Sequence, residues 1–230
     1  SFAPIRRGKK LFWLTIFAIA FGFVESSVVV YLRRIYYGDE TALFPLKIFE
    51  QGIFTVELFR EAATLLMIYA VAAAAFDKNI LRFAGFIWGF AVWDIMYYVF
   101  LKLSINWPAT ILDWDILFLI PIAWASPVLA PVVCSLTMLL LAGIIFFYSE
   151  KNYAVKFSRL QIIFLVTGSL VILISFLLDY ATLFLNTPNE LTQEAIAHYV
   201  PRDFNWLLFS AGEALILFAV WDLMKGMRKE

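Results

Sequence analysis

Six long apolar runs, separated by polar connections, divide the chain. A helix needs roughly 20 apolar residues to cross the hydrocarbon core of a membrane. Six segments meet this requirement, at about 11–32, 56–76, 83–103, 128–148, 160–183 and 204–224. The pattern predicts an all-α, polytopic membrane protein with six transmembrane helices, in which residues 1–230 form a single transmembrane helical domain.

Three connections on one side of the predicted bundle are the longer ones, at about 33–55, 104–127 and 184–203. In the first, apolar and polar residues alternate over Phe44–Glu50, which is typical of a segment lying in the membrane interface. In the third, Thr187–Glu190 matches a helix start, with Thr as N-cap and Pro at the first helical position. A short surface helix to about Tyr199 is therefore expected.

The connection before the fourth span has an unusual composition. Apolar residues run from Ile116 to Phe147, too far for one simple span, and Pro121, Pro127 and Pro131 interrupt them. Proline removes a backbone donor and kinks or ends a helix. Two interpretations follow: a partial, re-entrant helix before the fourth span, which must be buried in protein or line a wet cavity, or one long kinked helix.

Composition and charge support and orient this arrangement. The chain is 63% hydrophobic and 16% charged, with a mean hydropathy of +0.84. If the N-terminus is inside, twelve of the 18 Lys and Arg residues are cytoplasmic and six lie outside: Arg33, Arg34, Lys47, Arg60, Lys102 and Arg202. Basic residues favour the cytoplasmic side. Both termini are therefore expected in the cytoplasm, and the expected location is the cytoplasmic membrane of a bacterium or archaeon.

The same charge distribution narrows the class of partner. The formal net charge is zero, and the basic residues flank helix ends rather than forming a patch. Nucleic-acid binding has no electrostatic footprint in such a chain. Membrane lipids and other membrane subunits are the expected partners.

Acidic residues inside the apolar segments are the main functional signal. A carboxylate in hydrocarbon is costly unless it faces the protein interior or water, so such residues are candidates for a functional site. Helical rise of about 1.5 Å per residue places four of them in one band in the outer half of the membrane. These four are Glu25, Glu61, Asp94 and Glu213.

Helical spacing groups further polar residues with these acids. Glu57, Arg60 and Glu61 share one face of the second span, and Asp94 precedes two tyrosines by three and four residues on the third. The predicted ligand-binding residues are Glu25, Glu57, Arg60, Glu61, Asp94, Tyr97, Tyr98, Lys102 and Glu213. The structural alternative is that the acids form ion pairs that hold helices together.

Cofactor chemistry is restricted by the single histidine. His198 lies in a predicted outer loop, so bis-histidine haem and histidine-ligated metal sites are not expected. A site built from oxygen ligands suits Ca²⁺, Mg²⁺ or Mn²⁺, and Asp113 and Asp115 are the candidate ligands. No nucleophile constellation is present, so the sequence identifies no catalytic residue.

Three functions fit these observations. The first is an outward-facing crypt of carboxylates and arginine that binds a polar or cationic head group or a hard metal ion, with catalysis on a lipid-linked substrate as an extension. The second is an accessory subunit of a larger membrane complex. The third is a proton- or cation-coupled transporter, suggested by the acids and by a Trp-Asp pair repeated in spans of opposite direction, Trp93-Asp94 and Trp221-Asp222.

Overall fold

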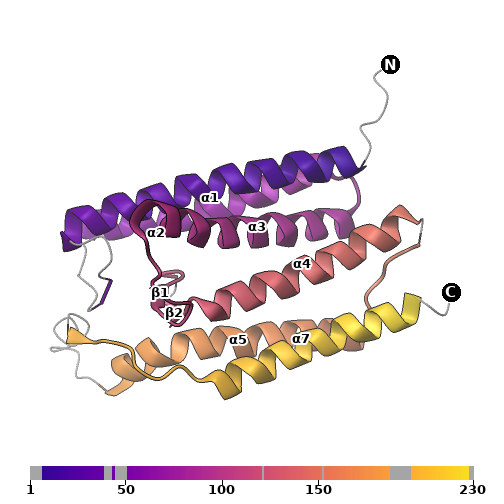
Figure 1. The fold of residues 1–230 in the computed structure, drawn as a ribbon. Helices are drawn as coiled ribbons and strands as arrows, with labels where there is room; N and C mark the ends of the chain where they lie inside the picture. The colour runs from indigo at the N-terminus through magenta and orange to yellow at the C-terminus, as the bar shows by residue number, and fades with distance from the viewer. Residues whose placement is uncertain are drawn as a thin grey trace.

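The described part of the chain contains six long helices. The computed structural model describes residues 7–38, 43–44, 51–120, 122–151, 153–186 and 198–227. The helices are α1 (Arg7–Tyr37), α2 (Gln51–Ala75), α3 (Asn79–Ile105), α4 (Leu129–Glu150), α5 (Arg159–Asn186) and α7 (Trp206–Met227) (Figure 1). All six are long and apolar enough to cross a membrane. The predicted six long, apolar helices are confirmed, and they fit an all-α polytopic membrane protein.

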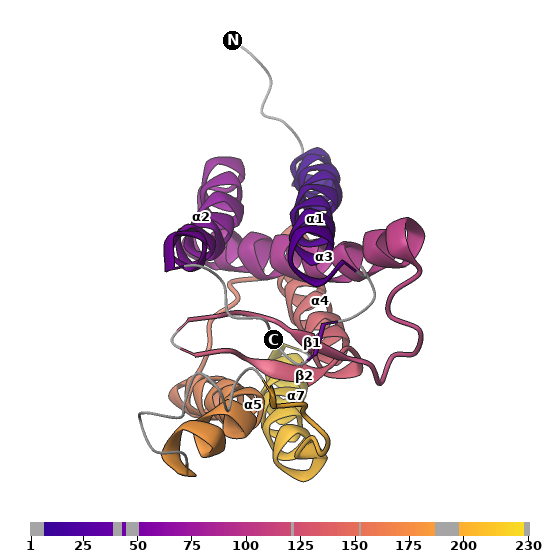
Figure 2. The same cartoon turned by 90° about the vertical axis from the view of Figure 1, so that its left-hand side faces the viewer.

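The helices lie side by side in layers. Both α1 and α2 pack on α3, α3 packs on α4, α4 contacts α7, and α7 packs on α5 (Figure 2). The helix α4 therefore joins a group formed by α1, α2 and α3 to the pair formed by α5 and α7. The start of α1 and the end of α7 lie at the same end of the bundle (Figure 1).

Glycines allow the closest helix crossings. A Cβ atom built on Gly22 of α1 would lie 2.9 Å from the carbonyl oxygen of Trp93 in α3. Similarly, a Cβ on Gly168 of α5 would lie 2.7 Å from the carbonyl oxygen of Gly212 in α7, and one on Gly212 would lie 2.8 Å from that of Gly168. Small residues of this kind let helix backbones approach closely in membranes.

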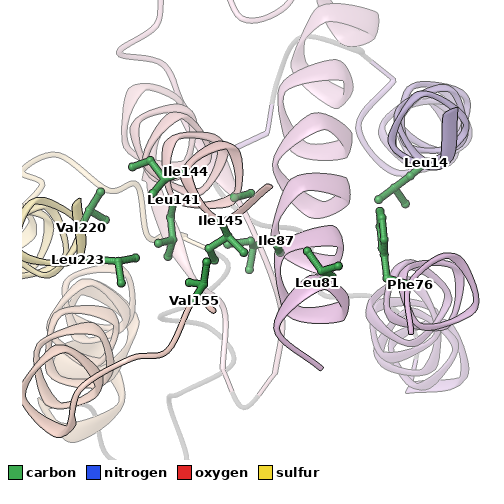
Figure 3. Packing of buried hydrophobic residues seen from close by; sticks show 12 residues of the cluster. Leu14, Phe76, Leu81, Ile87, Leu141, Ile144, Ile145, Val155, Val220 and Leu223 are labelled. Carbon is green, nitrogen blue, oxygen red and sulfur yellow. The ribbon is translucent and has the colours of Figure 1, made fainter. Parts of the chain in front are cut away.

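The half of the bundle near the termini has an apolar core. Its buried side chains come from α1, the residue that follows α2, the start of α3, the second half of α4, the connection after α4, and α7. Figure 3 shows this cluster, with Leu14, Phe76, Leu81, Ile87, Leu141, Ile144, Ile145, Val155, Val220 and Leu223 labelled. Helix α3 crosses the cluster, so this core fixes the third and fourth helices against each other at the end remote from the site described below.

The segment before α4 differs from both predictions made for it. In place of a partial helix or a long kinked helix, Trp114–Ile116 (β1) pairs antiparallel with Ala125–Pro127 (β2), Trp114 opposite Pro127. Two bonds close the intervening loop: the Leu117 N–H donates to the Trp124 carbonyl at 2.8 Å and the Trp124 N–H to the Phe118 carbonyl at 2.8 Å. The hairpin thus satisfies backbone groups that the prolines would have left unpaired in a helix.

Helix ends also differ from the predicted spans. Helix α1 continues to Tyr37, so Arg33 and Arg34 lie in its last turns rather than in the loop predicted at 33–55. Helix α3 ends where Asn106 adopts a left-handed conformation (φ 56°) and its N–H donates to the Lys102 carbonyl. Most of the predicted interfacial segment and most of the predicted surface helix before Tyr199 lie outside the described residues.

Candidate functional site

A cavity of about 740 Å³ lies at the hairpin end of the bundle. Its walls come from α1, α2, α3, α4 and the hairpin, with Tyr180 added by α5. Five carboxylates and two guanidinium groups line it, on Glu25, Glu57, Glu61, Asp94, Asp115, Arg33 and Arg60. Most of the remaining lining is apolar or aromatic, including Val29, Leu32, Phe90, Phe118, Ile122 and Met138.

The face of α2 toward the cavity carries its acids in helical register. Glu57, Glu61 and Thr64 are buried, and the same stripe continues downward as Ile68 and Ala72. Residues three and four apart share a helix face, so the stripe that packs on α3 near the termini becomes acidic where it reaches the cavity. The sequence spacing predicted this shared face.

Arg60 is held between two carboxylates. Its Nε donates to Glu57 Oε2 at 2.8 Å, and its Nη1 pairs with Glu25 of α1. The Thr64 hydroxyl adds a long contact of 3.5 Å to the second oxygen of Glu25. Arg60 thereby joins α1 to α2 at the level of the cavity.

Among the described residues, Glu61 accepts hydrogen bonds from a backbone N–H and from no cation. The backbone N–H of Leu119 in the hairpin loop lies 3.0 Å from each of its carboxylate oxygens. Its side chain is buried, with 6% of the residue exposed. This contact fastens the hairpin loop to α2 without neutralising the carboxylate.

Asp94 has a similar environment on α3. It accepts a hydrogen bond from the Ser135 hydroxyl of α4 at 2.8 Å and is 9% exposed. Within the described part of the chain, neither Asp94 nor Glu61 forms an ion pair. These two acids are therefore the cavity's carboxylates without a cationic partner there.

Arg33 and Asp115 form a second, fully buried pair. Arg33 Nη2 lies 3.2 Å from Asp115 Oδ1, and each side chain is 2% exposed. The Tyr97 hydroxyl donates to Asp115 Oδ2 at 3.4 Å, and the Arg33 guanidinium stacks 3.9 Å from the centre of the Trp107 ring. Burial raises the pKa of the Asp115 carboxyl, and the positive charge of Arg33 opposes that shift.

The tyrosines of α3 lie between these groups. Tyr97 is close enough to interact electrostatically with the Arg33–Asp115 pair and with Glu25 and Arg60. Tyr98 stacks edge-on against Tyr97, with ring centres 4.9 Å apart. Both tyrosines line the cavity, as do Glu25, Glu57, Arg60, Glu61 and Asp94 from the predicted set.

Two residues of the predicted set lie outside the cavity. Lys102 is exposed, and its Nζ donates to the Asn106 and Pro108 carbonyls at 3.3 and 2.8 Å. Glu213 is buried between α4 and α7, where the Thr137 hydroxyl donates to its Oε2 at 2.9 Å. The predicted depth of Glu213 in the membrane placed it in the band of acids. Its side chain lies on the face of α7 that meets α4 at Thr137, and it does not line the cavity.

The two candidate metal ligands bind different groups. Asp113 accepts from the Ala109 N–H at 2.7 Å and the Thr110 hydroxyl at 2.8 Å, which closes a local turn. Asp115 instead pairs with Arg33. Across the described ranges, no three His, Cys, Asp or Glu side chains are grouped to hold a metal ion.

Several cavity residues were not among the predicted site residues. Arg33 was assigned to a loop, because its charge and that of Arg34 resemble the end of a span. Ser135 lies within the predicted fourth span, and no sequence signal links it to Asp94. The contact of Leu119 with Glu61 is made by a backbone group, so no side-chain pattern could have revealed it.

Comparison with known proteins identifies no relative. No family model, curated protein or solved structure matches the chain.

Proposed function

We propose that this membrane-integral protein binds a single-chain amphiphile whose cationic head group, such as an ammonium, sits between Glu61 and Asp94. The observation that carries the proposal is the charge balance of the cavity. Five carboxylates face two guanidinium groups there, and both guanidiniums already have carboxylate partners. A buried carboxylate without a counter-charge is costly, and a cationic ligand would supply that charge.

The shape and lining of the cavity support an amphiphile. A volume of about 740 Å³ is in the range of sites for drug-sized ligands, which are mostly apolar with a few convergent polar groups. Phe90, Phe118 and Met138 offer apolar surface beside the acids. A single alkyl chain could lie against them while its head group reaches the carboxylates.

The proposed orientation follows from the charge distribution. Both termini lie in the cytoplasm, because most of the Lys and Arg residues then fall on the cytoplasmic side. The cavity, at the opposite end of the bundle, then faces outward from a bacterial or archaeal cytoplasmic membrane. The amphiphile enters from the outer leaflet or the outer interface.

The other functions receive less support from the geometry. A hard metal ion needs several converging oxygen ligands, whereas three of the five carboxylates are engaged with arginine. A coupled transporter needs a polar route to the cytoplasm, and the apolar cluster that includes Leu14, Ile87 and Ile145 fills that half of the bundle. An accessory role in a larger complex, and catalysis on a lipid-linked substrate, have no specific observation in their favour.

Dodecylamine is a suitable probe for this proposal. Binding to the protein in nanodiscs would be measured by native mass spectrometry and by tryptophan fluorescence, since Trp93 and Trp124 line the cavity. Glu61→Gln and Asp94→Asn should each weaken binding about tenfold, because each removes one charge-assisted contact of about 1.5 kcal/mol. The double variant should lose saturable binding.

Glu213→Gln is the matched control. It neutralises a carboxylate that is buried as deeply as Glu61 but lies outside the cavity. Dodecylamine affinity should remain within about twofold of that of the unmodified protein. Equal affinity in the unmodified protein and the Glu61→Gln/Asp94→Asn variant would refute the proposed function.

A further inference from the structure

The cavity also contains buried donors that lack acceptors. Within the described residues, Arg33 Nε and Nη1, Trp93 Nε1 and the Tyr180 hydroxyl have no hydrogen-bond partner. All three side chains line the cavity, and they are 2%, 6% and 1% exposed. They come from α1, α3 and α5, so the unmet donors surround the cavity rather than belonging to one helix.

Arg33 is the strongest of these donors. A guanidinium has five N–H groups, yet among the described residues only Nη2 of Arg33 has an acceptor. One face of the guanidinium plane lies over the Trp107 ring. The second oxygen of Asp115 accepts a hydrogen bond from the Tyr97 hydroxyl and none from Arg33. A buried donor left unsatisfied costs about 1–3 kcal/mol, and more when it is charged. This cost argues for an acceptor that occupies the cavity.

The Arg33 donors belong to α1, whereas the unpaired acids belong to α2 and α3. Arg33 is in the last turns of α1, and Tyr37 one turn later interacts with Tyr180. Tyr97 lies within electrostatic range of Arg33 and also of the cluster around Arg60. One head group could therefore meet the Arg33 donors and the carboxylates of α2 and α3.

We infer that the ligand is zwitterionic, with an oxyanion such as a phosphate at Arg33 and an ammonium at Glu61 and Asp94. This inference rests on the proposed function and adds a second charge to its ligand. A guanidinium edge pairs Nη2 with either Nε or Nη1. One of the partnerless nitrogens of Arg33 and the second N–H of Nη2 can therefore donate to two oxygens of one phosphate, which is the recognition geometry typical of arginine. A phosphoethanolamine head group carries both charges.

The test compares two probes with matched alkyl chains. Lauroyl lysophosphatidylethanolamine carries the phosphate and the ammonium, whereas dodecylamine carries only the ammonium. Both would be titrated into nanodisc-embedded protein and followed by native mass spectrometry. The phospholipid should bind about tenfold more tightly, the gain expected from a charge-assisted contact of about 1.5 kcal/mol.

Variants of the Arg33–Asp115 pair isolate the phosphate contact. Arg33→Gln/Asp115→Asn removes both charges and so leaves no uncompensated buried ion; it should bring the two affinities to within about twofold. Asp115→Asn alone keeps the guanidinium and should preserve the preference for the phospholipid. Arg33→Lys keeps the charge but removes the forked donor, and should lose most of the preference.

Lys102→Gln is the matched control, because it removes a cation at the same end of the bundle but outside the cavity. It should keep the full preference. Circular dichroism and thermal unfolding would establish that each variant is folded. A preference for the phospholipid that survives in Arg33→Gln/Asp115→Asn, or is absent from the unmodified protein, would overturn the inference.

The outcomes separate this inference from the proposed function. If dodecylamine binding depends on Glu61 and Asp94 but no preference for the phospholipid depends on Arg33, only the zwitterionic assignment is overturned. Binding of neither probe overturns both. Inorganic phosphate is the third probe. Two results would show that the oxyanion at Arg33 is a free ion: phosphate that binds there without competing with the phospholipid, or phosphate that binds when neither amphiphile does. Either result would overturn the head-group assignment.

Discussion

The carboxylates of the cavity are held in different ways, and each way has its own energetic consequence. Glu25 and Glu57 share one cation, Arg60, whereas Glu61 and Asp94 have only neutral donors among the residues that the structure describes. Removing Arg60 would leave two buried carboxylates, Glu25 and Glu57, without their cation. Glu61 and Asp94 differ, because their hydrogen-bond donors carry no charge that could balance theirs. Arg60 is therefore expected to stabilise the fold, and Glu61 and Asp94 to bind the ligand.

Arg60→Gln tests the structural half of this division. It should lower the stability of the protein by about 2 kcal/mol, the size expected for hydrogen bonds to charged groups. The fall should appear as a lower thermal unfolding temperature in detergent. Adding Glu25→Gln to Arg60→Gln should restore part of the loss, because only one buried acid then lacks its partner. A further fall in the double variant would show that Glu25 is not stabilised through Arg60.

The sequence predicted the helix-borne part of the site and missed the part made by tertiary contact. Helical spacing alone placed Glu57 and Glu61 on one face of α2, and both line the cavity. Asp94 could be identified as costly in hydrocarbon, but its partner Ser135 could not, because pairing between helices depends on their rotation. Rotation also removed Glu213 from the site, although its depth was suitable.

At the level of elements, the pair formed by α5 and α7 depends on two facing glycines. The backbone of each helix occupies the space where the Cβ of the other glycine would be, with distances of 2.7 and 2.8 Å. If either helix moved away to make room for a larger side chain, the packing between α5 and α7 would be lost. The crossing therefore fixes α7, which contacts α4 and so supports one wall of the cavity.

Gly168→Val should disrupt this crossing. Forcing extra carbon atoms into a tight contact costs about 1–3 kcal/mol, so the thermal unfolding temperature should fall. Gly143→Ala is the control, because no atom lies within 4 Å of the added Cβ on α4 and alanine favours helix formation over glycine. Equal unfolding temperatures for Gly168→Val and Gly143→Ala would contradict the close crossing.

The hairpin shows why the segment before α4 was predicted wrongly. Its prolines correctly indicated that no regular helix could run from Ile116 into α4. An apolar stretch at membrane depth was nevertheless expected to be helical, because unpaired backbone groups are costly there. Strand pairing between Trp114–Ile116 and Ala125–Pro127 satisfies backbone groups of this segment without a helix. The Leu119 N–H is satisfied by a side chain of α2, Glu61.

The whole molecule divides into two halves of different chemistry. The half near the termini is packed with apolar side chains, whereas the half at the hairpin contains the cavity and its charged groups. The sequence indicated this division, since polar residues are sparse in one half of the predicted spans. It could not indicate that the hairpin closes part of the cavity, because that depends on how distant segments meet.

The proposed orientation can be measured on the intact membrane protein. In a Cys134→Ala background, Ala109→Cys places a thiol at the hairpin end and Lys156→Cys places one at the end with the termini; both positions are exposed. In intact cells, a membrane-impermeant maleimide should label only Ala109→Cys. Labelling of Lys156→Cys alone would reverse the orientation and place the cavity toward the cytoplasm.

Photo-crosslinking is the most direct measurement of where the ligand binds. Dodecylamine carrying a diazirine on its chain would be bound to the protein in nanodiscs, irradiated, and the modified residues identified by mass spectrometry. We predict labels on cavity residues such as Phe90, Phe118 and Met138, and their loss in Glu61→Gln/Asp94→Asn. Labels confined to exposed apolar residues such as Phe59 and Leu103, and unchanged in that variant, would contradict a binding site in the cavity.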